Sequence, residues 1–177
     1  MLPVWKSFEG PTAGGAFDQL LHTAIDVGIA RAALDDGAAF VRSRTRVWFE
    51  SDADQVTEEP DVLVRFGQLA GRVLVAEATL RDAARAYDRI TADELTDDNT
   101  AELSILVAAA KANAVDVAVD TASAVFELAG TAATDAEHAL DRHWRNARTH
   151  TLHDPLRWKQ RHIGAFALTG TRPPRHS

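Results

Sequence analysis

The chain has 177 residues, a length that suits one domain with a sizeable core. It contains no cysteine, which excludes disulfide bonds, thiolate metal sites and cysteine nucleophiles. No apolar run approaches the roughly 20 residues that a membrane-spanning helix requires, and no signal-peptide pattern opens the chain. A soluble cytoplasmic protein with no membrane partner is the simplest interpretation.

The formal net charge of −7 conceals an uneven distribution. Residues 142–177 hold eight Lys and Arg and one acid, a net charge of +7, which leaves −14 for residues 1–141. A basic tail is found in many nucleic-acid-binding proteins, but the larger acidic part would repel a phosphate backbone. The pattern therefore favours a local anion site, or a basic element docked against acidic helices, over a nucleic-acid partner.

The first 15 residues contain two Pro and three Gly without a helical period, so we expect an extended lead-in. A first long helix is predicted from about Ala16 to Trp48. Gly37 has a low helix propensity, a cost that this helix tolerates. The cations of residues 42–46 suit the negative end of a helix dipole. Small residues in its apolar stripe suggest the close approach of another helix. The stripe consists of Leu21, Ile25, Gly28 and Ala32.

Heptad patterns predict a second helix from about Asp61 to Arg89 and a third from about Thr100 to Leu128. Asn99 and Glu102 resemble a capping box at the start of the third helix. This helix is also apolar on its opposite face, which is typical of a helix inside a bundle or at a subunit contact. The second stripe consists of Val62, Phe66, Leu69, Val73, Ala76, Leu80, Ala83 and Tyr87. The third consists of Leu103, Val107, Ala110, Ala114, Val117, Thr121, Ala124 and Leu128.

A fourth long helix is predicted to lead into a stretch rich in Arg and His, residues 142–158. Gly130 occupies the position expected just after the end of the third helix. Thr134 and Glu137 then form a second capping box, which predicts the start of the fourth helix.

A short fifth helix is predicted over about residues 155–168. Asp154 is its expected N-cap and Pro155 its expected first residue. Residues 169–177 form a tail. Because no alternating strand pattern appears, the predicted fold class is all-α: an up-and-down bundle of four long helices with a short fifth helix, spanning residues 16–168.

Three arginines near the end of the fourth helix are candidates for anion binding. Arg142, Arg145 and Arg148 fall roughly along one helix face and offer forked donors, to which Thr131 and Thr149 can add hydroxyl groups. The alternative is that these arginines pair with acids of the first two helices.

Two histidines lie beside the joint between the last two helices. His150 or His153 could serve as a general acid or base, because imidazole titrates near neutrality, although such histidines are more often structural. A dimetal centre is disfavoured because no Glu-x-x-His pairs occur on paired helices, and because the adjacent arginines would repel a divalent ion. We therefore expect no metal.

Residues 140–155 read Leu-Asp-Arg-His-Trp-Arg-Asn-Ala-Arg-Thr-His-Thr-Leu-His-Asp-Pro, a run rich in rare residue types. This run resembles the C-terminal signature of the acyl-CoA dehydrogenase superfamily, in the branch of flavin-dependent monooxygenases that includes dibenzothiophene monooxygenase and the sulfur-acquisition oxidoreductases. The resemblance extends over essentially the whole chain. Further matching segments are Pro11-Thr12, Ala16-Phe17, Gln19, the helix from Asp26 to Leu34, Glu127 to Thr131, and the tail from Arg172 to His176.

The resemblance implies a flavin site between this bundle and a β-domain, completed by a neighbouring subunit. Arg46 matches a cation that reaches the flavin phosphate. Gly130 and Thr131 match a segment that approaches the cofactor across the subunit contact. Arg148, from the candidate anion site, and His150, beside the joint, are also expected to bind the cofactor.

The resemblance assigns the catalytic role to His153, in the His-Asp-Pro motif. The matching histidine faces the flavin ring and helps to form or stabilise a flavin hydroperoxide. Acyl-CoA dehydrogenases instead use a glutamate base on a helix of this domain. The acids nearest the joint, Glu127 and Glu137, have no clear match, which favours oxygenation over acyl-CoA oxidation.

The implied function is that of the C-terminal domain of a reduced-flavin-dependent monooxygenase of small organosulfur or aromatic compounds, with a role in sulfur metabolism. Its implied cofactor is FMN, reduced by a partner flavin reductase, with FAD as the alternative. The alternative functions are an acyl-CoA dehydrogenase domain and a non-catalytic helical oligomerisation module. A homo-oligomer, a dimer or the family's tetramer, is expected. The family's other domains are missing, so we expect a truncated chain, with Trp5 and Phe8 as a remnant of the β-domain.

Overall fold

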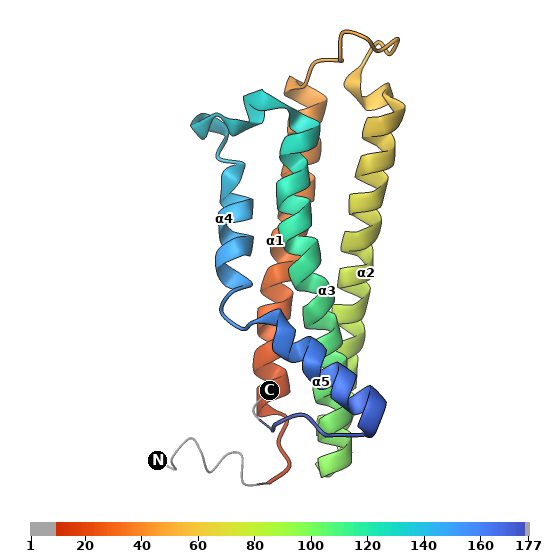
Figure 1. Ribbon diagram of the computed structural model, residues 1–177, viewed down its shortest axis with the longest axis vertical. Coiled ribbons are helices and arrows are strands. Elements are labelled where there is room, and N and C mark those ends of the chain that lie inside the picture. Colours follow the sequence, from red (N-terminus) through yellow and green to blue (C-terminus); the bar gives the residue numbers. More distant parts are fainter. Residues whose placement is uncertain (1–9, 176–177) are drawn as a thin grey trace. The chain divides into compact units, whose positions relative to one another are not determined.

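A computed structural model describes residues 10–175, and the regular elements in this range are all helical (Figure 1). The all-α fold class is confirmed, but the fourth helix has only 10 residues and is not long. Trp5 and Phe8 lie outside the described residues. No helix in the described range is both long and apolar enough to cross a membrane. The helices are α1 (Gly14–Arg44), α2 (Pro60–Thr91), α3 (Asp97–Ala129), α4 (Asp141–His150) and α5 (Leu156–Thr169), with 3-10 turns at Val56–Glu58, Thr131–Thr134 and Ala136–His138.

Helix packing divides the described residues into two compact units. The first unit contains residues 10–25, 76–114 and 154–175, and the second contains residues 26–75 and 115–153. Helices α1, α2 and α3 each contribute residues to both units, whereas α4 belongs to the second unit and α5 to the first.

The heptad stripes predicted for the second and third helices are confirmed. All eight stripe positions of α3 are buried, and those of α2 are buried or half-buried. Both stripes contain alanines among their larger apolar side chains, so neighbouring backbones can approach closely there. Each fully buried Leu or Val contributes about 1.5–3 kcal/mol of transfer free energy, and this packing is the main source of helix stability.

The apolar stripe predicted for the first helix is wrong. Leu21 and Ile25 are 51% and 48% exposed, and a Cβ added to Gly28 would meet no atom within 4 Å. A helical period does not tell which of two apolar faces is buried. The buried face also carries Asp26, which obscures its apolar character. That face contains Ala16, Leu20, Thr23, Val27, Ala30, Leu34 and Val41.

The predicted C-terminal end of the first helix is also too late, because α1 ends at Arg44 rather than near Trp48. Two contacts in the second unit draw the following residues out of the helix. Thr45 Oγ1 donates to the carbonyl oxygen of Ala129 at 3.4 Å, and Trp48 N donates to Glu59 Oε1 at 3.0 Å.

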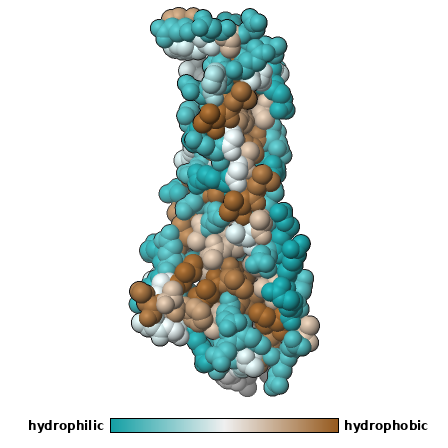
Figure 2. Space-filling view, turned by 90° about the vertical axis from the view of Figure 1, so that its right-hand side faces the viewer, coloured by the Kyte–Doolittle hydropathy of each residue, from teal (hydrophilic) through white to brown (hydrophobic). Residues whose placement is uncertain are grey.

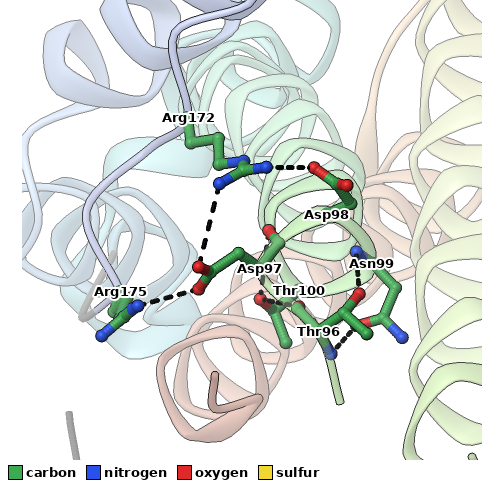
Figure 3. Close-up of polar contacts among 7 residues, drawn as sticks. All are labelled: Thr96, Asp97, Asp98, Asn99, Thr100, Arg172 and Arg175. Atoms are coloured by element: carbon green, nitrogen blue, oxygen red, sulfur yellow. Dashed lines mark hydrogen bonds and ion pairs between the residues drawn. The ribbon is translucent and has the colours of Figure 1, made fainter. Parts of the chain in front are cut away.

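The helix α3 begins with a capping box three residues earlier than predicted (Figure 3). Asn99 N donates to Thr96 Oγ1 at 3.1 Å, and Thr96 N donates to Asn99 Oδ1 at 2.8 Å. The predicted box of Asn99 and Glu102 is therefore wrong, because Asn99 is the third residue of the helix and not its cap.

The basic tail docks on the acidic first turn of α3, which confirms one of the two interpretations of the charge distribution (Figure 3). Arg175 Nη2 lies 2.8 Å from Asp97 Oδ1, and Arg172 contacts both Asp97 and Asp98. Carboxylates at a helix N-terminus are also stabilised by the helix dipole. The same two aspartates thus form part of the first turn of α3 and bind the arginines of the tail.

Hydrophobic side chains remain exposed on the helices. On the face that Figure 2 shows, hydrophobic patches interrupt the hydrophilic surface. The helix α2 exposes two pairs of apolar residues that are neighbours in sequence, Leu63 with Val64 and Leu74 with Val75. Its charged side chains nearby pair with α3, as in Arg72 Nη1 to Asp120 Oδ2 at 2.7 Å.

Gly37 is required by packing and is not merely a tolerated cost. A Cβ at this position would lie 2.7 and 2.9 Å from the two Val125 methyl groups. We predict that Gly37→Ala lowers the free energy of unfolding by about 1–3 kcal/mol, because overpacking outweighs the better helix propensity of alanine. Urea unfolding measures this change.

The control is Gly71→Ala, because a Cβ on this helical glycine meets no atom within 4 Å. It should stabilise the protein by up to about 1 kcal/mol. Adding Val125→Ala to Gly37→Ala should make the glycine substitution less costly than it is alone. Equal effects of Gly37→Ala and Gly71→Ala would contradict the packing argument.

Candidate functional site

One carboxylate of α1, Asp36, holds the first turn of α4. His143 Nε2 lies 2.7 Å from Asp36 Oδ2, and Arg142 Nη2 donates to the same oxygen. Arg142 therefore pairs with an acid of the first helix. Such pairing was the alternative to anion binding that the sequence left open. Arg145 pairs within α4, with its Nε 2.9 Å from Asp141 Oδ2.

A second carboxylate of α1 holds the last residue of α4. Asp26 Oδ1 lies 2.6 Å from Nδ1 of His150. The side chain of Asp26 is fully buried, whereas that of His150 remains 19% exposed. Helices α1 and α4 run antiparallel, since the later histidine pairs with the earlier aspartate. Both pairs lie in the second unit. Between them Ala147 is fully buried, so α4 presents a narrow inner face to α1.

Arg148, His150 and His153 lie together at the C-terminal end of α4, and we call them the histidine cluster. The turn after the helix is closed by a hydrogen bond from His153 N to the His150 carbonyl oxygen at 3.1 Å. His153 is exposed in this turn, and Arg148 is exposed on the outer face of α4. Arg148 lines an open hollow of about 400 Å³, together with Trp144, Arg145, Asn146, Thr149 and Leu152.

The helix start expected after this turn differs from the prediction. Asp154 is not the N-cap, because α5 begins at Leu156 and Pro155 occupies the cap position without a side-chain bond. The Asp154 carboxylate instead lies 2.9 Å from the buried Lys159 Nζ. A buried ammonium needs a counter-charge, and this need takes precedence over capping.

Arg46, Gly130 and Thr131 form a second group, which we call the turn cluster. Gly130 ends α3 with φ 73° and ψ −173°, a conformation essentially restricted to glycine. A Cβ there would meet no atom within 4 Å, so the turn is open. The hydrogen bond between Thr45 and Ala129 joins the chain neighbours of Arg46 and Gly130. Arg46 and Thr131 are both exposed.

The capping box predicted from Thr134 and Glu137 is wrong. Thr134 Oγ1 donates back to the Thr131 carbonyl oxygen at 2.7 Å, and Asp135 accepts from Glu137 N at 3.0 Å. These bonds stabilise two short 3-10 turns in place of a helix, which is why α4 begins only at Asp141.

The predicted site residues therefore fall into two clusters. The histidine cluster is tied to α1 at Asp26 and the turn cluster lies just beyond Arg44, and both belong to the second unit. Asp26 and Arg44 are 18 positions apart in α1, which corresponds to about 27 Å of helix. This exceeds the length of one FMN molecule. One chain does not bring all six predicted residues around a single flavin.

The reading of the sequence missed the two aspartates that orient α4. Asp26 and Asp36 lie in a helix rich in alanine, and Asp26 stands among Ala24, Ile25 and Val27. An acid within an otherwise apolar run was the available signal, because such a residue is buried only when it has a partner.

Comparison with known proteins identifies the family. Residues 20–158 match the family model described as acyl-CoA dehydrogenase, C-terminal domain. The dibenzothiophene monooxygenase of Mycolicibacterium goodii is 34% identical over 163 residues, which are 90% of this chain and 39% of that protein. The probable FMNH2-dependent monooxygenase SfnC of Pseudomonas putida is 34% identical over 157 residues, which are 88% of this chain and 40% of that protein.

A solved structure has the same fold. TdsC from Paenibacillus sp. A11-2, in a complex with FMN and indole, superimposes with a TM-score of 0.87 at 34% identity. The match covers 92% of this chain and 42% of TdsC. This chain thus spans about two fifths of the length of the relatives that it matches. The chain belongs to the family of acyl-CoA dehydrogenase C-terminal domains.

Proposed function

We propose that this chain is the C-terminal helical domain of a reduced-FMN-dependent monooxygenase that acts on small organosulfur or aromatic compounds. One observation carries the proposal: 34% identity over nine tenths of the chain to monooxygenases, one of which was solved with FMN and indole. The family includes dehydrogenases, but the dibenzothiophene monooxygenase and SfnC, each 34% identical to this chain, are oxygenases by name.

The chemistry of the two clusters fits FMN. The exposed Arg46 follows Thr45, which bonds Ala129 next to the open Gly130 turn, and it suits the phosphate because Arg offers forked donors to phosphate oxygens. The imidazoles of His150 and His153 suit the reacting end, where a proton must be held or moved. Reduced FMN supplies two electrons and two protons, so that one oxygen atom of O2 is transferred to the substrate and the other leaves as water.

We propose further that a complete site requires two copies of the chain. The two clusters lie about 27 Å apart along α1, so the turn cluster of one copy would meet the histidine cluster of another. The exposed apolar side chains of α1 and α2, such as Leu21 and Leu74, provide surface for such a dimer or tetramer.

The proposed partners follow from the cofactor. A separate flavin reductase would supply reduced FMN in the cytoplasm, and the oxygenated products would belong to sulfur metabolism. Residues 16–168 would then belong to the helical bundle, which in the family follows a β-domain.

The proposed function predicts FMN binding and coupled oxygen consumption by the protein as its gene encodes it. FMN affinity is measured by quenching of flavin fluorescence, and Arg46→Ala should weaken it by at least about tenfold, the effect of losing one charged hydrogen bond. Sulfoxide formation from dibenzothiophene, driven by a reductase and NADH, measures oxygenation. A wild-type protein with neither FMN affinity nor oxygen uptake would refute the function.

The two-copy site predicts complementation between defective variants. Arg46→Ala and His153→Ala should each lower oxygenation when assayed alone at limiting FMN. When the two are refolded together, mixed oligomers should recover part of the activity, because some sites then take Arg46 from the His153→Ala chain and His153 from the Arg46→Ala chain. Mixtures that stay inactive, although mass spectrometry shows mixed oligomers, would contradict a shared site.

His153 is proposed as the catalytic residue of the pair of histidines. Its backbone is held by the turn, while its side chain is exposed. We predict that His153→Ala lowers oxygenation by about a hundredfold, since one preorganised hydrogen-bond donor contributes on the order of 3 kcal/mol. The melting temperature should change little. His138→Ala is the control, because His138 packs edge-on against the ring of Phe40 and belongs to neither cluster. A His153 variant that melts earlier but oxygenates normally would show a structural role.

A further inference from the structure

Two carboxylate–histidine pairs join the same two helices, but they are not equivalent. In the pair of Asp36 and His143, the ring is only 8% exposed and the carboxylate is shared with Arg142. In the pair of Asp26 and His150, the carboxylate is fully buried while the ring is 19% exposed. The imidazole of the first pair is thus buried, whereas the imidazole of the second pair is partly exposed to solvent.

We propose that Asp26 is a positioning residue of the FMN site, which acts by orienting His150 and selecting its tautomer. The inference rests on the proposed function. It adds a residue that is distant in sequence from the Arg- and His-rich stretch and that belongs to a different helix.

The geometry assigns the proton of the pair. An ionised carboxylate can only accept hydrogen bonds, so at 2.6 Å Nδ1 of His150 must carry the hydrogen that Asp26 Oδ1 accepts. The neutral ring is then the Nδ1–H tautomer, in which Nε2 carries the lone pair and acts as an acceptor or a base. The free imidazole samples both tautomers, whereas a fixed partner on one nitrogen selects one of them.

This pair helps to dock α4, but burial indicates that docking is not its whole role. A fully buried aspartate costs desolvation energy, and buried ion pairs are often no more stabilising than apolar side chains of similar volume. Helix α4 is already held by Asp36 with two partners and by the buried Ala147. The buried Asp26 lies opposite the C-terminal end of α4, which leads directly to His153.

The first test reads the tautomer without any flavin. Long-range ¹H–¹⁵N NMR of protein labelled with ¹⁵N-histidine distinguishes protonated from unprotonated ring nitrogens, and His150→Asn identifies the His150 signals by their loss. We expect the Nδ1–H form in the wild type and a mixture of tautomers in Asp26→Asn. The matched control is Asp36→Asn, which removes the other pair and should leave the His150 signals unchanged.

The second test measures function with the same variants. Asp26→Asn should lower kcat for oxygenation by about 10- to 100-fold, the usual effect of losing the partner that orients a histidine, with the KM for substrate unchanged. Asp36→Asn should lower the melting temperature and leave kcat per folded protein unchanged.

A further variant separates docking from chemistry if Asp26→Asn fails to fold. In His150→Asn the side-chain amide can still donate to Asp26 from the former position of Nδ1, but it has nothing at the position of Nε2. It should fold and lose kcat to the same extent as Asp26→Asn.

The outcomes are distinguishable. An Nε2–H tautomer in the wild type, His150 signals unaffected by Asp26→Asn, or full kcat in folded His150→Asn would each overturn the proposal. A wild-type protein that neither binds nor uses FMN would overturn the proposed function and with it the functional role of Asp26. The NMR experiment would then still decide whether Asp26 selects the tautomer.

Discussion

The arrangement of the second unit depends on the attachment of α4 to α1 by Asp26 and Asp36. With 10 residues, α4 is too short to be a stable helix alone, so its position must come from tertiary contacts. Two histidines two helical turns apart reach the two carboxylates, and a buried alanine lies between them. Removing either histidine would take a hydrogen-bond partner from a carboxylate of α1, which weakens the attachment of α4.

This attachment determines what the rest of the Arg- and His-rich stretch can do. Once His143 and His150 face α1, Trp144 and Arg148 must face outward, because they lie on the opposite side of the helix. The exposed hollow that these two line, and the exposure of His153 in the following turn, are consequences of the inner face. The same three arginines that looked like one anion site in the sequence are thereby divided between an α1 partner, an α4 partner and the outer surface.

The uneven charge of the chain has a structural explanation in the first unit. The tail arginines meet aspartates that also lie in the first turn of α3, so the carboxylates are stabilised twice, by the dipole and by the cations. These groups are largely exposed, and each such pair contributes at most about 1 kcal/mol. Their arrangement places the tail, but it does not carry the stability of the fold. That stability comes from the stripes of α2 and α3.

The sequence alone determined the helical fold class, the bounds of α2 and α5 to within two residues, and both heptad stripes, because these depend on local periodicity and on burial of apolar surface. The family was also evident from residues 140–155. Tertiary structure decided which apolar face of α1 is buried, since both faces satisfy the same period. It decided that Asp154 pairs with the buried Lys159 and does not cap α5, whereas the capping box of Thr96 and Asn99 is a local feature that was predicted three residues too late. It also decided that the predicted site residues form two separate clusters and that Asp26 lies against His150. Distance along the chain carries no information about distance in space, and 124 residues separate these two.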